Sequence, residues 1–120
     1  MALRIAVQMD PLESVNIDAD STFAMMLEAQ RRGHSMVEYH PDTLTYENGT
    51  IRAHVRPVTI QRDYDDHAQF SAARSIDLAR ESDVVLMRQD PPFDMQYIAA
   101  THLLESIHGV GNNKTFCVNH

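Results

Sequence analysis

The sequence predicts an α/β fold with a mostly parallel sheet flanked by helices. Apolar runs rich in branched residues alternate with segments of helical periodicity, a pattern typical of βαβ units. The run Val84-Val85-Leu86-Met87 contains no polar residue, as expected for a strand that helices cover on both faces. A chain of 120 residues forms one domain and buries about two thirds of the surface of its unfolded form.

The first third of the chain predicts a strand, a loop, a helix and a second strand. Leu3 to Met9 is apolar and forms the first strand, and a polar loop follows from Pro11 to Asp20. A helix from Ser21 to Arg32 carries an apolar stripe, and either Asp20 or Ser21 can cap its first turn. Ser35 to Tyr39 is expected to form the second strand.

The dipeptide Asn48-Gly49 joins two alternating runs and predicts a β-hairpin over about 44–56. A type I′ turn needs a positive φ at both central residues, which Asn and Gly tolerate. The second arm alternates between an apolar and a basic face. We expect exposure to solvent for the basic face, which comprises Arg52, His54 and Arg56. The hairpin should extend one edge of the sheet or project from it.

The remainder of the chain gives less uniform signals. Residues 61–82 have the weakest periodicity, and we expect short helical pieces at 68–73 and 76–80. A helix with apolar positions at i, i+3, i+4 and i+7 is predicted from Asp94 to Gly109, and a buried strand from Thr115 to Val118. Because the strands at 3–9 and 84–87 are the most apolar, we expect them to be adjacent and central.

The junction that follows residues 84–87 is the strongest indication of a binding site. Arg88-Gln89-Asp90 is followed by two prolines, which fix φ and push Asp90 out of the helical region. Arg88 and Asp90 therefore lie on a stiff turn at the carboxyl end of a strand, where open α/β sheets bind ligands. The alternative is that the two side chains only pair with each other, and that the prolines merely end the strand.

Composition excludes several classes of protein. A net charge of −7 argues against a nucleic-acid surface, which requires a basic patch. No window approaches 18 apolar residues, so we expect no membrane span, and the first residues do not resemble a signal peptide. The single cysteine, Cys117, excludes an internal disulfide and is typical of the reducing cytoplasm. We expect its thiol to be inert, because its neighbours are apolar.

Known site patterns are also missing from the sequence. The seven histidines are scattered without zinc-type spacing, so we expect no metal ligands and no catalytic residue of the Ser-His-Asp or Cys-His kind. The loop Asp10-Pro11-Leu12-Glu13 has no glycine and two carboxylates, whereas phosphate-binding loops need glycine and repel carboxylates. A phosphorylation receiver domain requires an acidic pair after its first strand, but Asp10 stands alone.

Several blocks of the sequence resemble the N-terminal domain of bacterial glutathione synthetase. The most specific are Met9-Asp10-Pro11, Asn16-Ile17, residues 20–33 and residues 86–94. Shorter matches extend the resemblance in order over essentially all 120 residues: Asn48-Gly49, Arg52-Ala53-His54 and the closing Val118-Asn119. Gln89 departs from the lysine common in the family, and residues 61–82 match only loosely.

The resemblance implies that residues 1–120 form a Rossmann-like pre-ATP-grasp domain. In that family an ATP-grasp region follows and carries ATP, Mg²⁺ and most catalytic groups. Because this chain stops just after a strand, we expect it to be truncated at that boundary, inactive alone and without its own cofactor. The full enzyme would be cytoplasmic and would join γ-glutamylcysteine to glycine, giving glutathione, ADP and phosphate.

The resemblance also implies a substrate-binding role for the strand-end residues. Arg88 offers a planar donor fork suited to a carboxylate, and Asp90 either accepts from a substrate ammonium or orients Arg88. Asp10, Ser14 and Asn16 are further candidates on the neighbouring loop, with turn capping as an equally good explanation of their presence.

Two other functions remain open from the sequence alone. The first is a different ATP-grasp ligase that joins another acid and amine. The second is a free-standing binding or oligomerisation module without catalysis. We also expect a homo-oligomer, because apolar surface should be exposed where the missing region packs. Neither nucleic acid nor a membrane is an expected partner.

Overall fold

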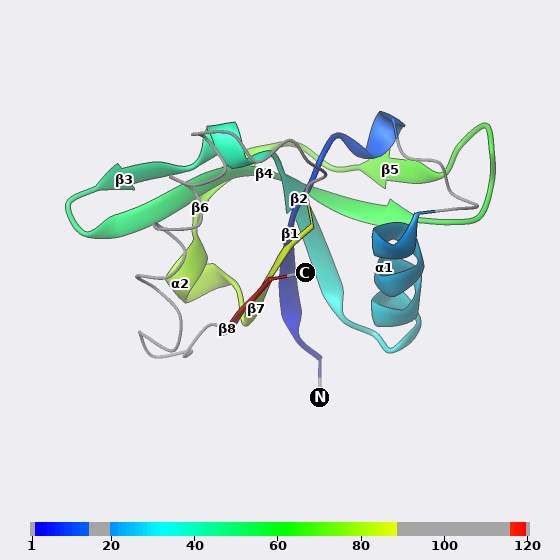
Figure 1. Cartoon of the computed structure of the whole chain (residues 1–120), viewed down its shortest axis with the longest axis horizontal. Coiled ribbons are helices and arrows are strands. Elements are labelled where there is room, and N and C mark those ends of the chain that lie inside the picture. Colours follow the sequence, from blue (N-terminus) through cyan, green and yellow to red (C-terminus); the bar gives the residue numbers. More distant parts are fainter. Residues whose placement is uncertain (1, 15–19, 89–115, 120) are drawn as a thin grey trace.

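The computed structural model of the chain describes residues 2–14, 20–88 and 116–119 and shows an α/β fold with a mixed, curled sheet (Figure 1). The helices are α1 (Ser21–Arg31), α2 (Leu78–Glu81) and the short 3-10 turns η1 (Leu12–Ser14) and η2 (Pro41–Thr43). The strands are β1 (Arg4–Gln8), β2 (Ser35–Tyr39), β3 (Thr45–Glu47), β4 (Thr50–Ile60), β5 (Ala68–Phe70), β6 (Arg74–Asp77), β7 (Val84–Met87) and β8 (Phe116–Asn119).

The sheet has the strand order β3-β4-β2-β1-β7-β8 and is mixed, so the prediction of a mostly parallel sheet is wrong. β1 is parallel to β2 and β7, and β7 is parallel to β8. β4 is antiparallel to β2, β3, β5 and β6. Two parallel strands need a crossover connection of about a dozen residues or more, usually a helix. The connection between β2 and β4 contains only η2 and the short strand β3, so β4 runs antiparallel to β2.

The prediction that the two most apolar strands are adjacent and central is confirmed. β1 lies between β2 and β7, and Ile5 pairs with Val84. The predicted hairpin is also confirmed as β3 and the start of β4 at one end of the strand order. Its turn residues Asn48 and Gly49 have φ of 51° and 80°, as a type I′ turn requires.

The segment 61–82 differs from the prediction. The expected helix at 68–73 is wrong, because Ala68–Phe70 forms β5 and pairs with the outer half of β4. The expected turn at 76–80 is partly correct: β6 ends at Asp77, and the single-turn helix α2 follows. The helix expected from Asp94 to Gly109 lies outside the described residues.

Two cores lie on opposite faces of the sheet. The α1-side core comprises Ile5, Val7, Met9, Leu12, Phe23, Met26, Met36, Val58 and Ile60. The α2-side core comprises Ala6, Tyr39, Ile51, Ala53, Val55, Ile76, Leu78, Val85 and Met87. The alternation of Ile5, Ala6 and Val7 between them follows from the two-residue period of a strand. β1 is therefore covered on both sides, as its apolar sequence indicates.

The basic face of β4 is less exposed than expected. Arg52, His54 and Arg56 share one face as predicted, but only His54 is exposed, whereas the two arginines are half-buried. Arg52 donates from Nε to Ser75 Oγ (2.9 Å) on β6. Arg56 is covered by two other elements. Phe70 of β5, which pairs with Val58, lies against its guanidinium, and Glu13 of η1 accepts a hydrogen bond from it.

The start of α1 depends on its N-cap. The Oδ1 atom of Asp20 accepts a hydrogen bond from the backbone N of Phe23 (2.9 Å). Replacing Asp20 with alanine leaves this amide unsatisfied and is expected to lower the free energy of unfolding by about 1 kcal/mol. Urea denaturation measures this loss. Asp20→Asn is the matched control, because asparagine caps equally well; a similar loss in both variants would contradict the capping role.

Candidate functional site

The carboxyl ends of β1, β2 and β7 lie along the same side of the sheet, because these three strands are parallel. We call this side, where the strands end, the carboxyl edge. The backbone N of Arg88 donates to the carbonyl of Gln8 (2.7 Å), so the pairing of β7 with β1 continues one residue past β7. The backbone N of Met9 donates to the carbonyl of Tyr39 (3.0 Å) in the same way. Arg88 and the loop that begins at Asp10 are therefore neighbours, as the sequence predicts.

The guanidinium of Arg88 is directed to the first turn of α1. Its Nε donates to Thr22 Oγ1 (3.1 Å), and Nη2 donates to Ser21 Oγ (2.8 Å). Thr22 is buried and Arg88 half-buried, so these contacts restrict the rotamers of the arginine. The amino end of a helix carries a partial positive charge, and together with Arg88 it makes this corner attractive to an anion. Asp90, the expected neighbour, lies outside the described residues.

The two hydroxyl residues were not singled out from the sequence. The sequence indicates Ser21 only as a possible helix cap and Thr22 only as part of the helix, whereas both contact Arg88, 67 and 66 positions away. The only sequence signal is a pair of adjacent hydroxyls in the first turn of a helix, which is also an ordinary capping pattern. These contacts show that the first turn of α1 contributes side chains to the carboxyl edge.

Asp10 lies at the same edge, beside the start of η2. Its Oδ1 is 4.0 Å from Nε2 of His40, and Nδ1 of His40 is 2.8 Å from Oδ1 of Asp42. Each of these side chains is at least a third exposed, so the group is accessible to a ligand. Ser14 ends η1, but its side chain is not described, and Asn16 also lies outside the described residues.

A cavity of about 300 Å³ lies beside the loop after β1. Its walls come from the loop after β1, the end of β2 with η2, the middle of β4 and the segment before β6: Met9, Pro11, Glu38, Tyr39, His40, Thr43, His54, Arg56 and Ala73. Arg88 is not among the described residues that line this cavity.

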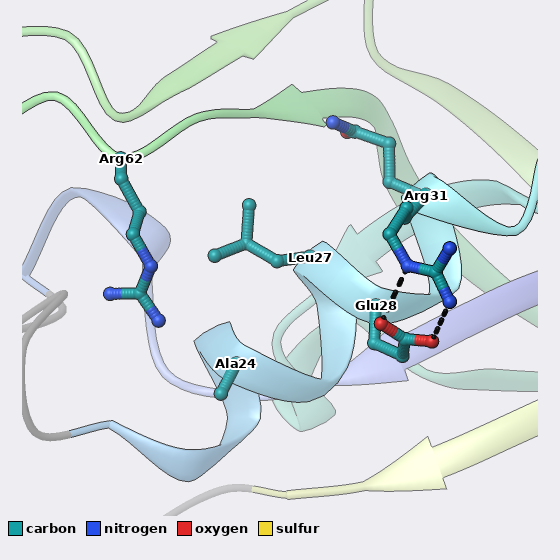
Figure 2. A pocket seen from close by; sticks show the side chains of 6 residues that line it. Ala24, Leu27, Glu28, Arg31 and Arg62 are labelled. Carbon is teal, nitrogen blue, oxygen red and sulfur yellow. Dashed lines mark hydrogen bonds and ion pairs between the residues drawn. The ribbon is translucent and has the colours of Figure 1, made fainter.

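A larger cavity of about 480 Å³ lies along α1 (Figure 2). Figure 2 shows Arg62 facing Leu27 and Ala24 across this space. Arg31 is bound to Glu28 through hydrogen bonds of 2.9 and 2.6 Å. Of the candidate residues whose side chains the structure describes, neither Arg88 nor Asp10 lines this cavity, so the carboxyl edge remains the candidate site.

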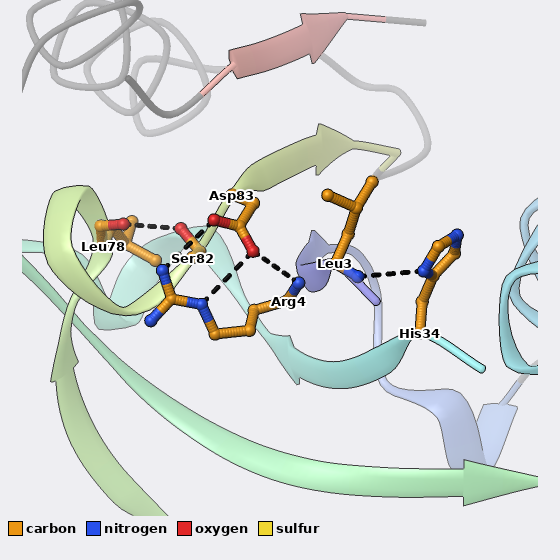
Figure 3. A network of polar contacts seen from close by, with 6 residues as sticks. All are labelled: Leu3, Arg4, His34, Leu78, Ser82 and Asp83. Atoms are coloured by element: carbon orange, nitrogen blue, oxygen red, sulfur yellow. Dashed lines mark hydrogen bonds and ion pairs between the residues drawn. The ribbon is translucent and has the colours of Figure 1, made fainter. Parts of the chain in front are cut away.

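The opposite edge of the sheet is held by a separate polar network (Figure 3). The carboxylate of Asp83 accepts hydrogen bonds from the backbone N (2.8 Å) and Nε (3.2 Å) of Arg4. The backbone N of Leu3 donates to Nδ1 of His34 (3.0 Å), and Ser82 Oγ donates to the carbonyl of Leu78 (2.5 Å). These groups join the amino ends of neighbouring elements and contribute nothing to the carboxyl edge.

Within 2–14, 20–88 and 116–119, no cluster of three or more His, Cys, Asp or Glu side chains is arranged to hold a metal ion. Burial raises the pKa of the Cys117 thiol to about 11, which agrees with the expectation of an inert side chain. No helix in this part of the chain is long and apolar enough to cross a membrane.

Comparison with known proteins identifies the family. Residues 3–120 match the family described as prokaryotic glutathione synthetase, N-terminal domain. The chain is 49% identical over 119 residues to the glutathione synthetase of Brucella melitensis, an alignment that covers 99% of this chain and 36% of that protein. It is 47% identical over 108 residues to the Rhodopseudomonas palustris glutathione synthetase, covering 90% and 34%.

A less similar relative gives the same result. The glutathione synthetase of Escherichia coli K12 is 42% identical over 103 residues, which are 86% of this chain and 32% of that protein. The chain thus spans about a third of the length of the curated relatives it matches. The resemblance inferred from the residue blocks is confirmed, and the chain belongs to the family of prokaryotic glutathione synthetase N-terminal domains.

Proposed function

We propose that this chain is the substrate-binding N-terminal part of a glutathione synthetase. The whole protein would join γ-glutamylcysteine to glycine at the expense of ATP and release glutathione, ADP and phosphate. The observation that supports this most directly is the family match over residues 3–120, together with identities of 42–49% to proteins named glutathione synthetase.

In this reaction the cysteinyl carboxylate becomes an acyl phosphate, and the amine of glycine then displaces phosphate. The role of this chain is to hold γ-glutamylcysteine at the carboxyl edge of the sheet. Arg88 binds a substrate carboxylate with the donor atoms that Ser21 and Thr22 do not engage. Holding the dipeptide in one orientation lowers the barrier by removing freedom before the reaction.

The other candidates complete the proposed binding surface. Asp90 accepts from the substrate ammonium or orients Arg88, and Asp10 faces the same edge beside His40. Ser14 and Asn16 belong to the loop after β1 and contact the dipeptide or shape the loop. None of these residues transfers a proton or forms a covalent bond in the proposed reaction.

ATP and Mg²⁺ are proposed to bind outside this chain, in an ATP-grasp region of the whole protein. The loop after β1 has two carboxylates and no glycine, which does not fit a phosphate group. Residues 1–120 would then be the Rossmann-like pre-ATP-grasp domain that covers one side of the cleft. We further propose a cytoplasmic homo-oligomer; β3, exposed along its length at the end of the strand order, offers an edge for pairing between copies.

The proposed division of function is tested with two proteins. The complete protein, expressed from the gene that encodes this chain, is expected to form glutathione from γ-glutamylcysteine, glycine and ATP. The 120-residue chain is expected to form none and to show no micromolar affinity for ATP in calorimetry, because it lacks a phosphate-binding loop.

The outcomes separate the competing functions. Micromolar ATP binding by the 120-residue chain would contradict the assignment of ATP to another region. Activity of the complete protein with a different acid and amine, but not with γ-glutamylcysteine and glycine, would indicate another ligase of the same architecture. Absence of any ATP-dependent coupling would favour a binding or oligomerisation module.

A further inference from the structure

Arg56 of β4 links β2, β5 and the η1 turn, which is part of the loop after β1. It lies on β4, opposite Glu38 of β2 in the antiparallel ladder, and its Nε donates to Oε1 of Glu38. Its two terminal nitrogens donate to Oε2 and Oε1 of Glu13 on η1, at 3.0 and 2.9 Å. The ring of Phe70 on β5 covers one face of the guanidinium, 3.7 Å from Cζ to the ring centroid.

These contacts hold the guanidinium of Arg56 in one orientation, and Glu13 is its more exposed partner. The Glu38 side chain is only 5% exposed and belongs to a paired strand, so it holds Arg56 from the sheet side. The Glu13 side chain is 59% exposed and is attached to a short turn rather than to a strand. Hydrogen bonds from Arg56 lower the pKa of Glu13, against the opposing effect of its partial burial, so the carboxylate stays charged at neutral pH.

Glu13 lies within the turn that carries two candidate substrate-binding residues. Asp10 precedes η1 and Ser14 ends it. The same turn is anchored a second time at Leu12, which is fully buried and whose carbonyl is 2.6 Å from Nε2 of His67. Leu12 fixes the depth of the turn in the core, and a bidentate pair from Arg56 fixes its orientation over the sheet.

We propose that Arg56 is a positioning residue for γ-glutamylcysteine binding: acting through Glu13, it holds the turn 10–14 in the orientation that keeps Asp10 at the carboxyl edge of the sheet, where Arg88 also lies. This inference rests on the proposed function. It gives a role to a residue that the alternation of β4 had placed on a solvent-exposed basic face. Arg52, on the same face of β4, contacts β6 instead and does not reach the turn.

Two variants of the complete enzyme test the proposal without leaving a buried charge unpaired. Glu13→Gln removes the exposed partner, while Arg56 still pairs with Glu38. Arg56→Lys keeps a cation beside Glu38 but cannot form the bidentate pair. Each is expected to raise the KM for γ-glutamylcysteine about threefold to tenfold, with kcat and the KM values for ATP and glycine nearly unchanged.

The double variant and a matched control sharpen the test. Because both substitutions break one interaction, Glu13→Gln combined with Arg56→Lys should be no worse than either alone. Arg52→Lys changes the same residue type on the same face of β4 and should leave every KM unchanged. Faster amide hydrogen exchange in residues 10–14 of the Glu13→Gln and Arg56→Lys enzymes, but not of Arg52→Lys, reports the loosened turn independently of activity.

The failure of this inference is distinct from the failure of the proposed function. An unmodified enzyme that forms no glutathione refutes the proposed function, whatever Arg56 does. An active enzyme in which both variants keep the KM for γ-glutamylcysteine overturns the positioning role. So does an equal rise in all three KM values with a lower Tm, which indicates a general loss of structure, or unchanged exchange in residues 10–14.

Discussion

Replacing Arg88 with alanine in the complete enzyme is expected to cost roughly 2–5 kcal/mol in the interaction with γ-glutamylcysteine, as for a buried charge pair that loses one partner. The loss should appear in kcat/KM for the dipeptide and much less in the KM values for ATP and glycine. The geometry gives the reason: Ser21 and Thr22 hold the guanidinium, so little rotamer freedom is lost when a carboxylate binds.

Two controls separate a binding role from a structural one. Arg88→Lys should recover only part of the loss, because an ammonium cannot make two parallel hydrogen bonds to a carboxylate. Arg31→Ala removes an exposed arginine that pairs with Glu28 on the outer part of α1, and it should leave all kinetics unchanged. Circular dichroism confirms folding of each variant; unchanged γ-glutamylcysteine kinetics in a folded Arg88→Ala enzyme would make the residue structural.

Replacing Phe23 with alanine is expected to lower the free energy of unfolding of this chain by about 3–5 kcal/mol. Phe23 is fully buried in the α1-side core, and its ring lies 6.0 Å from that of His67. The substitution removes a fully buried aromatic side chain by which α1 packs on the sheet, and it leaves a cavity. Urea denaturation with an unchanged m-value measures the loss.

Met25 supplies the matched control for Phe23, because it lies on the same helix but is 42% exposed. Met25→Ala should change the free energy of unfolding by about 0.5 kcal/mol or less, as surface substitutions usually do. Equal effects at the two positions would show that α1 does not depend on its buried face. The comparison also bears on the site, since α1 presents Ser21 and Thr22 to Arg88.

The elements predicted correctly are those with a strong local signal. Asn48-Gly49 encodes its turn in two residues, and α1 is bounded by the cap at Asp20 and the positive φ of 87° at Gly33. β1 and β7 follow from continuous apolar runs. In contrast, β5 has only three residues and forms because β4 offers it a partner, so its sequence alone carries no strand period.

The candidate site is predictable only in part, because some of its contacts join residues that are far apart in the sequence. Arg88 was found because its position after a buried strand and before two prolines is local. Its partners Ser21 and Thr22, and the Arg56–Glu13 pair, join residues more than 40 positions apart. An alternating strand indicates which face a side chain occupies, but not what covers that face. Arg56 therefore looked like a solvent-exposed residue.

The central place of β1 has a consequence for how the chain folds during synthesis. β1 is made before β7, yet the Arg4–Asp83 contact that joins the two strands spans 79 positions. Until β7 leaves the ribosome, β1 pairs only with β2 and presents one unpaired apolar edge, the kind of surface through which nascent chains associate. We therefore expect this protein to depend on chaperones during translation more than its size suggests.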